Sequence, residues 1–239
     1  GMREWGSGHV LRHHLGMDAQ IKGTPGVWEP RIPPLARNRT VAILGLGELG
    51  TACAETLLAL GFTVTGWSRS PKSIPGVTSF HGDDGLMACL STAEIAVLLL
   101  PNTPATENTL NARTLAAMPR GSFVINPGRG PLIDDEALLA ALDSGQIAHA
   151  TLDVFRIEPL PQDHPFWSHP RVTVTPHIAA ETKAGVVLMH MQGQPRTMQK
   201  QPTYENVVAE VRDFFTERLD LADKVGIERD RIAFDPGIG

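Results

Sequence analysis

The feature that most constrains the fold is a glycine-rich turn between an apolar strand and a helix. The apolar residues from Val41 are followed by Gly45-Leu-Gly47-Glu-Leu-Gly50, which has the spacing G-x-G-x-x-G. Gly45 permits a tight turn, Gly47 lets a ligand approach the backbone, and Gly50 lets the helix pack closely on the strand. The first amides of such a helix bind anions. The pattern therefore predicts a site for the pyrophosphate of a dinucleotide. It is not a Walker loop, because no Gly-Lys-Ser/Thr follows.

From Thr40 onward, short β-rich runs alternate with helical patterns. Helices are indicated at 49–60 and at 134–143, and each ends before a glycine. Repeated strand–helix–strand units have right-handed crossovers and form a parallel sheet with helices on its faces. We therefore predict an α/β fold with a doubly wound parallel sheet of Rossmann type between about residues 40 and 182. The strands expected in this sheet are 41–45, 63–67, 95–101, 122–126, 148–154 and 172–175.

Composition and charge narrow the possible function classes. The formal net charge of −5 gives no reason to expect nucleic acid or an anionic membrane as a partner. No apolar run approaches the ~20 residues of a membrane helix. Cys53 and Cys89 lie in apolar helical stretches, where we expect buried thiols of a protein in a reducing cytosol. We expect a cytoplasmic protein without a metal site. Gly1-Met2 has no signal-peptide pattern and is interpreted as the remnant of a cleaved tag.

The chain is expected to divide into a domain at 1–183 and an appended segment at 184–239. The first domain opens with a helix at 3–20 and a linker rich in glycine and proline. The apolar stripe of the appended helix would face water if the helix stood alone. We therefore expect the appended strands to extend the Rossmann sheet, with the helix on one face. The appended elements expected are a strand at 186–191, a polar loop at 192–202, a helix at 205–225 that Gly226 stops, and a strand at 231–235.

The end of the second strand, Gly66-Trp-Ser-Arg-Ser-Pro-Lys72, discriminates between cofactors. An acidic residue there would bind the two ribose hydroxyls of NAD. Arg69 lies instead between Ser68 and Ser70, and a guanidinium flanked by hydroxyls suits the 2′-phosphate of NADP(H). A solvated surface turn is the alternative interpretation. We expect binding of NADP(H), with NAD(H) less favoured, and assign Trp67 and Lys72 to the same site.

Three later segments place chemically active side chains after strands. Arg129, Glu158 and His177 each follow a predicted strand, so all three should lie at the carboxyl edge of the sheet, where ligands of open α/β folds bind. An arginine can bind the carboxylate of a 2-oxo acid and polarise its carbonyl. A histidine can deliver a proton while hydride arrives, and a glutamate can orient that histidine. Together, and in this order after the glycine turn, the three residues predict reduction of a 2-oxo acid. Each residue taken singly is more often structural.

Residues from about Trp5 to Thr182 resemble the D-isomer-specific 2-hydroxyacid dehydrogenases, most closely the glyoxylate/hydroxypyruvate reductase branch. The resemblance rests on Gly45–Gly50, Leu100–Thr106, Asn126–Gly130, Asp153–Pro159 and Pro176–Ala180. It implies the catalytic roles just described for Arg129, Glu158 and His177. It also implies that Asp153 faces the nicotinamide carboxamide and that the opening helix belongs to a homodimer interface. The residues expected to bind the cofactor come from the glycine turn, the end of the second strand and the motifs of this resemblance. They are Gly45, Gly47, Glu48, Leu49, Gly50, Trp67, Ser68, Arg69, Ser70, Lys72, Leu100, Pro101, Thr106, Pro127, Gly128, Asp153 and Ala179.

The sequence departs from this family pattern in two places. Members of the family have a second, smaller α/β domain, formed mainly by residues that precede the opening helix. This domain closes over the nicotinamide and binds the substrate carboxylate. Neither that segment nor the family's C-terminal helix is found in this sequence. Because closure excludes water and completes the substrate site, we expect little or no turnover.

The residues after Thr182 resemble dihydropteroate synthase, a TIM barrel. The similarity lies in 187–198, in the helix from Tyr204 and in Arg231–Gly239, where the residue matching Asp235 binds the pterin ring in that family. One strand–helix–strand unit cannot close an eight-stranded barrel. We interpret the chain as an engineered chimera of a Rossmann-type and a TIM-barrel fragment.

Several functions remain open at this point. The chain could reduce glyoxylate or hydroxypyruvate with NADPH, or hold NADP(H) as a binding module with negligible turnover. It could instead be a fold chimera without a selected function, or a pterin-binding fragment. We favour cofactor binding with little catalysis, with a small 2-oxo or 2-hydroxy acid as the substrate if the chain is active.

Overall fold

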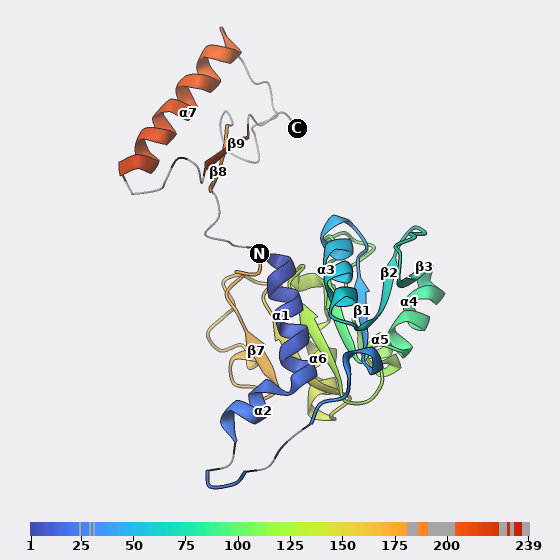
Figure 1. Ribbon diagram of the computed structural model, residues 1–239. Helices are drawn as coiled ribbons and strands as arrows, with labels where there is room; N and C mark the ends of the chain where they lie inside the picture. Colours follow the sequence, from blue (N-terminus) through green and yellow to red (C-terminus); the bar gives the residue numbers. More distant parts are fainter. Residues whose placement is uncertain are drawn as a thin grey trace. The chain divides into compact units, whose positions relative to one another are not determined.

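The computed structural model describes residues 1–23, 25–28, 30, 32–180, 186–190, 204–224, 229 and 232–235. The chain divides into two compact units, Gly1–Glu181 and Thr182–Gly239, and each is described here by itself. Figure 1 shows the ribbon of both. No helix in the described residues combines the length and apolarity needed to cross a membrane.

The first unit is built on a parallel sheet of seven strands in the order β3-β2-β1-β4-β5-β6-β7 (Figure 1). Chain order reverses between β1 and β4, as in a doubly wound sheet, so the predicted fold class is confirmed for this unit. The strands are β1 (Thr40–Leu44), β2 (Thr63–Ser68), β3 (Val77–His81), β4 (Ile95–Leu98), β5 (Ser122–Asn126), β6 (Ile147–Leu152) and β7 (Val172–Val174).

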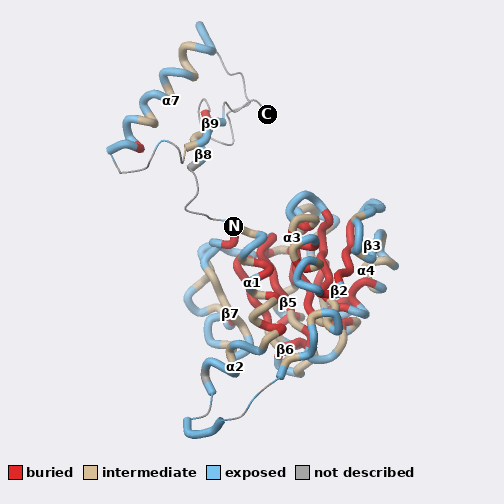
Figure 2. Tube along the Cα trace, viewed as in Figure 1, coloured by how far each residue is buried: buried red, intermediate tan, exposed pale blue. Residues whose placement is uncertain are grey.

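Alternating side chains of β1 fill two hydrophobic cores, one on each face of the sheet. Val41 and Ile43 belong to the core that includes residues of α1 and α3, whereas Ala42 and Leu44 belong to the core beneath α4, α5 and α6. All four side chains are fully buried, because helices cover both faces, and Figure 2 shows the central strands buried. The helices are α1 (Met2–Leu15), α2 (Met17–Lys22), α3 (Glu48–Ala59), α4 (Gly82–Ser91), α5 (Ala112–Ala117) and α6 (Asp135–Asp143), with 3-10 turns at η1 (Ala36–Asn38), η2 (Gly130–Leu132) and η3 (Pro165–Trp167).

The predicted opening helix at 3–20 is two helices. Gly16 has a φ of 64°, which is left-handed backbone, and it ends α1 and begins α2. Strand β3 and helix α5 were not predicted, and a helix around Cys89 was predicted only without bounds. The six predicted strands are present, although β4 ends at Leu98 rather than at Pro101.

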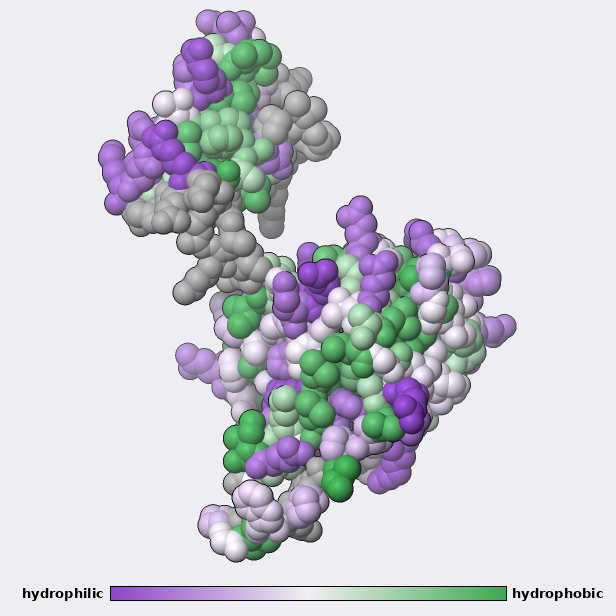
Figure 3. All heavy atoms as spheres, viewed as in Figure 1, coloured by the Kyte–Doolittle hydropathy of each residue, from purple (hydrophilic) through white to green (hydrophobic). Residues whose placement is uncertain are grey.

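The second unit contains β8 (Val186–Met189), α7 (Val207–Lys224) and β9 (Ile232–Asp235). Phe215 of α7 lies 4.5 Å from the ring of Phe234 in β9, and the ring of His190 meets Phe214 edge-on at 5.0 Å. The aromatic residues of α7 therefore pack on its own two strands. Several apolar side chains of this unit remain exposed, among them Val187 and Val208, and hydrophobic residues lie at its surface in Figure 3.

The appended strands were expected to extend the Rossmann sheet. In the described residues, β8 and β9 pair in parallel with each other in a two-stranded sheet, and Phe215 of α7 packs on Phe234 of β9. Each of these strands pairs along one of its two edges. The predicted loop at 192–202, the helix stop at Gly226 and the segment after Asp235 lie outside the described residues.

Candidate functional site

The glycine turn that follows β1 has the close contacts that its spacing predicts. Gly45 has a φ of 111°, and a Cβ atom built on it would lie 2.6 Å from the carbonyl oxygen of Leu99. A Cβ on Gly50 would lie 1.8 Å from the carbonyl oxygen of Gly45. A Cβ on Gly47 would meet nothing within 4 Å, so space is open above the residue that caps α3. The first amides of α3 therefore face a position where a phosphate fits.

A cavity of about 440 Å³ brings together the turn, the end of β2 and the segment after β4. The Oγ of Ser68 donates to the carbonyl of Ser70 at 2.7 Å, and Thr106 Oγ1 donates to the carbonyl of Pro101 at 2.6 Å, so both segments are braced internally. Ten predicted cofactor residues line this cavity: Gly45, Gly47, Trp67, Ser68, Arg69, Ser70, Lys72, Leu100, Pro101 and Thr106.

Two cations in this cavity are not used by the protein itself. In the described part of the chain, neither Arg69 nor Lys72 makes an ion pair or a side-chain hydrogen bond. Paired guanidinium and ammonium groups would have little attraction left for a ligand, whereas these two can both bind an added anion.

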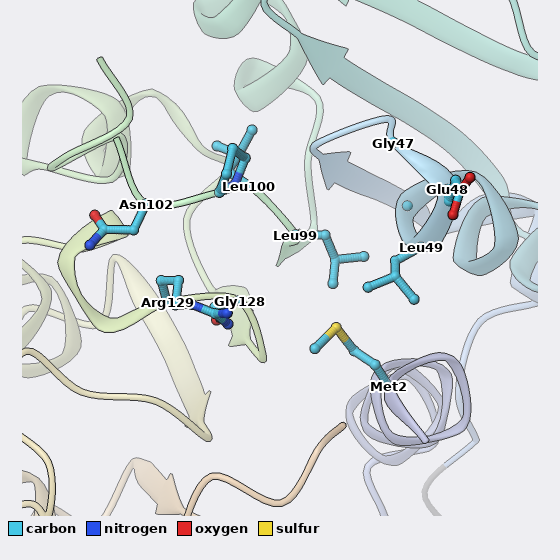
Figure 4. A pocket seen from close by; sticks show the side chains of 11 residues that line it. Met2, Gly47, Glu48, Leu49, Leu99, Leu100, Asn102, Gly128 and Arg129 are labelled. Carbon is cyan, nitrogen blue, oxygen red and sulfur yellow. The ribbon is translucent and has the colours of Figure 1, made fainter. Parts of the chain in front are cut away.

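A second cavity lies on the other side of the glycine turn (Figure 4). Gly47, Glu48 and Leu49 lie on one side of it, and Gly128 and Arg129 lie across from them. The lining residues shared with the first cavity are Gly47, Leu99, Leu100 and Pro101, so the two cavities adjoin at the turn. An extended ligand can therefore pass from the cations after β2, over the start of α3, to Arg129.

His177 and Glu158 form a hydrogen-bonded pair beyond the ends of β6 and β7. The Nδ1 atom of His177 lies 2.7 Å from Glu158 Oε2, and Glu158 Oε1 accepts from the backbone N–H of Phe155 at 2.9 Å. Burial raises the pKa of Glu158, but these two hydrogen bonds and the charges of His177 and Arg129 outweigh it and hold that pKa below its ordinary value. An ionised Glu158 fixes the proton of His177 on Nδ1 and leaves Nε2 to face a substrate.

Arg129 is held at the end of β5 by a turn centred on Asn126, which is 1% exposed. The side-chain amide of Asn126 donates to the carbonyl of Arg129 at 2.9 Å, and its Oδ1 accepts from the N–H of Gly128 at 3.1 Å. Pro127 and Gly128 are buried within the turn. Sequence reasoning did not identify Asn126 as the residue that shapes this turn. Its position at the last residue of a strand, just before Pro-Gly, was the available signal.

Asp153 acts on the site through the loop that carries His177. Its carboxylate is fully buried and accepts from the N–H groups of Ile178, at 3.0 Å, and Ala179, at 2.7 Å, and from the hydroxyl of Thr175. His177 lies in this loop with a φ of 56°. Asp153 and Ala179, which were predicted to bind the cofactor, are both buried, and the hydrogen bond between them helps to hold the loop that carries His177.

A further cavity, of about 450 Å³, adjoins the His177–Glu158 pair and was not predicted. Its walls are mainly apolar, with Phe155, Leu160 and Trp167 among them. Gly82 and Asp83, which line the first cavity, were also missed because β3 was not predicted. Among the described residues, no cluster of metal-ligating side chains is found.

Two family comparisons match different parts of the chain. The profile described as D-isomer specific 2-hydroxyacid dehydrogenase, NAD binding domain, matches residues 9–179. The profile described as pterin binding enzyme matches residues 168–239.

Curated relatives match about three quarters of the chain. Glyoxylate/hydroxypyruvate reductase A of Serratia proteamaculans is 48% identical over 182 residues, which are 76% of this chain and 58% of the relative. The Yersinia enterocolitica protein of the same name is 45% identical over 188 residues, or 78% of this chain and 60% of the relative. The chain thus spans about three fifths of the length of these relatives.

Solved structures agree with these relatives. A D-isomer specific 2-hydroxyacid dehydrogenase from Xanthobacter autotrophicus Py2, in complex with NADPH and MES, is 46% identical with a TM-score of 0.71, and the match covers 76% of this chain and 58% of that one. An NADPH-dependent glyoxylate/hydroxypyruvate reductase from Sinorhizobium meliloti, in apo form, is 40% identical with a TM-score of 0.70 and coverages of 76% and 73%. By its glycine turn, its sheet and these matches, the chain belongs to the family of the NAD-binding domain of D-isomer specific 2-hydroxyacid dehydrogenases.

Proposed function

We propose that this chain binds NADP(H) along the two adjoining cavities. The observation that carries the proposal is the pair of unpaired cations, Arg69 and Lys72, in the cavity that also contains the glycine turn. The 2′-phosphate would lie against them, and the pyrophosphate would lie on the first amides of α3. Two related solved proteins are described with NADPH or as NADPH-dependent, which agrees with this preference. NAD(H) lacks the phosphate and would bind more weakly.

The chemistry of the site would be reduction of a small 2-oxo acid, as in glyoxylate/hydroxypyruvate reductases. When bound, NADPH supplies the hydride. Arg129 would bind the substrate carboxylate, and Nε2 of His177 would give a proton to the carbonyl oxygen. Glu158 would orient His177 through the 2.7 Å contact with Nδ1.

We further propose that turnover by the 239-residue chain is slow. The side chain of His177 is 47% exposed, and in the described part of the chain nothing closes over it. Water therefore screens the charges that form during reduction, and the substrate is held by few groups. The proposal thus favours a cofactor-binding module over an efficient enzyme.

A turnover assay tests the catalytic part of the proposal. NADPH and excess glyoxylate or hydroxypyruvate are mixed with wild-type protein and with His177→Ala, and the absorbance of the reduced nicotinamide is followed. We expect a slow decay in the wild type that the variant loses. A wild-type rate equal to that of the variant would show that the three residues perform no chemistry in this chain.

We also propose a homodimer through the segment after α1. Trp28 and Ile32 are 99% and 89% exposed, and Ile21, in α2, is 81% exposed. Apolar side chains this exposed are typical of an interface. Light scattering should give twice the chain mass for the wild type and a lower mass for Trp28→Ser/Ile32→Ser. A monomeric wild type would refute the dimer.

The two family matches support a composite origin. One match ends at residue 179 and the other begins at residue 168, and both positions lie close to the boundary between the units after Glu181. We propose that the chain is an engineered chimera and that its second unit is a TIM-barrel fragment of pterin-binding type. An alternative is that no function was selected in the whole chain. Because one strand–helix–strand unit is a small part of a barrel, pterin binding is expected to be undetectable by calorimetry. Saturable pterin binding would instead favour the pterin-binding alternative.

A further inference from the structure

Asp83 is an anionic side chain in a cavity that is otherwise suited to an anionic ligand. It lies in the first turn of α4, directly after β3, and it lines the cavity that contains Arg69 and Lys72. A carboxylate repels the phosphates of a dinucleotide. It suits a part of the ligand that donates hydrogen bonds.

Asp83 makes no ion pair with the two cations of the cavity. No ion pair joins its carboxylate to Arg69 or Lys72 among the described residues, although all three side chains line the same space. The cavity therefore offers a ligand both cations for a phosphate and a carboxylate that can accept from a donor group.

The backbone next to Asp83 is fixed by Trp67. The indole N–H of Trp67 donates to the carbonyl of Gly82 at 2.7 Å, and the Trp67 side chain is 7% exposed. Strands β2 and β3 are also in register at this edge, with Trp67 opposite Phe80. The turn that carries Asp83 is thus braced against the strand that carries the phosphate-binding residues.

We propose that Asp83 is a specificity-determining residue that accepts a hydrogen bond from the exocyclic amine of the adenine ring. The inference rests on the proposed binding of NADP(H) and assigns its adenine to the part of the cavity at Gly82 and Asp83. The amine is a donor and suits a carboxylate. A base with a carbonyl oxygen at that position presents an acceptor to Asp83 and is repelled.

Isothermal titration calorimetry with NADPH and its hypoxanthine analogue tests the proposal. The analogue differs by replacement of the exocyclic amine with a carbonyl oxygen. A hydrogen bond to a charged group corresponds to about a ten- to hundredfold change in affinity, so the wild type should bind the analogue more weakly by about that factor. In Asp83→Asn the amide can either accept or donate, and the two nucleotides should bind within about threefold of each other.

Asp84→Asn is the matched control. Asp84 is the next acidic residue in the first turn of α4 and does not line the cavity, so its loss changes the net charge equally. It should keep the wild-type discrimination between the two nucleotides. Equal wild-type affinities for the two nucleotides, or equal effects of the two substitutions, would overturn the role of Asp83. A wild type that binds neither nucleotide would instead refute the proposed function itself.

Discussion

The buried carboxylate of Asp153 provides a quantitative test of how the loop that carries His177 is held. In Asp153→Asn one oxygen becomes an amide nitrogen. The remaining oxygen can keep the place of Oδ1, which accepts from Thr175 and Ile178. The nitrogen then faces the N–H of Ala179, which loses its 2.7 Å acceptor and stays buried. An unsatisfied buried N–H costs about 1–3 kcal/mol, and the two surviving bonds lose their charge assistance, so we expect a total of about 2–4 kcal/mol.

Urea unfolding followed by tryptophan fluorescence measures this loss for the first unit alone. All four tryptophans of the chain lie in that unit: Trp5, Trp28, Trp67 and Trp167. Asp143→Asn is the control, because the Asp143 side chain is 78% exposed and its contact with His169 is a surface pair worth less than ~1 kcal/mol. A cost for Asp153→Asn below about 1 kcal/mol, or equal to that of the control, would refute the reasoning.

Three further predictions use the same unfolding assay. Gly50→Ala should destabilise the first unit by ~3 kcal/mol or more, because its Cβ would lie 1.8 Å from the Gly45 carbonyl oxygen. Gly47→Ala has open space around its Cβ, so it should unfold like the wild type but bind NADPH at least about tenfold more weakly. Burial lowers the pKa of His13 from 6.5 to about 3, so the neutral ring stabilises the fold above pH 6.5 and this stability is lost as the pH falls toward 3. Between these values, His13→Gln should reduce the pH dependence of the free energy of unfolding by about 1.4 kcal/mol per pH unit. An unchanged pH dependence would contradict the burial argument. Because the pKa of Glu158 is lowered, its contribution is present above its ordinary value of 4.5 and is lost as the pH falls below it. The loss from His13 persists in both proteins, so Glu158→Gln should lose less stability below pH 4.5 than the wild type, and equal losses would count against the pair with His177.

Much of the first unit could be predicted from the sequence because central parallel strands are buried on both faces. Such strands are nearly continuous apolar runs, as in Val41–Leu44 of β1, and they are easily recognised among the more polar residues around them. Strand β3 is an edge strand with polar Thr78 and Ser79 between Val77 and Phe80, and it is only half-buried. Its pattern is weaker for that reason, and the turn with Asp83 was missed with it.

The site was predictable where it depends on chain order and not where it depends on packing. Arg129, Glu158 and His177 follow strands, so the fold alone brings them to one edge of the sheet. The contacts that hold them are set by buried side chains. Nothing in the spacing of Asp153 showed that its carboxylate would bind the His177 loop.

Strand pairing in the second unit illustrates the same limit. The apolar runs at 186–191 and 231–235 predicted strands, and β8 and β9 are found within them. A strand pattern gives the faces of a strand but does not name its hydrogen-bonded neighbour. The two strands pair with each other, which the periodicity could not distinguish from extension of the larger sheet.

The measurement that tests the central claim most directly is a parallel calorimetric titration with NADPH and NADH. The account predicts saturable binding of NADPH, at least about tenfold weaker binding of NADH, and a smaller preference in Arg69→Ala, since the guanidinium forms charge-assisted bonds to the 2′-phosphate and Lys72 remains. Arg113→Ala, at an exposed site that does not line either cofactor cavity, should bind both nucleotides like the wild type. Equal affinities for the two nucleotides, or a preference that is unchanged in Arg69→Ala, would contradict the assignment of the cavity at Arg69 to NADP(H).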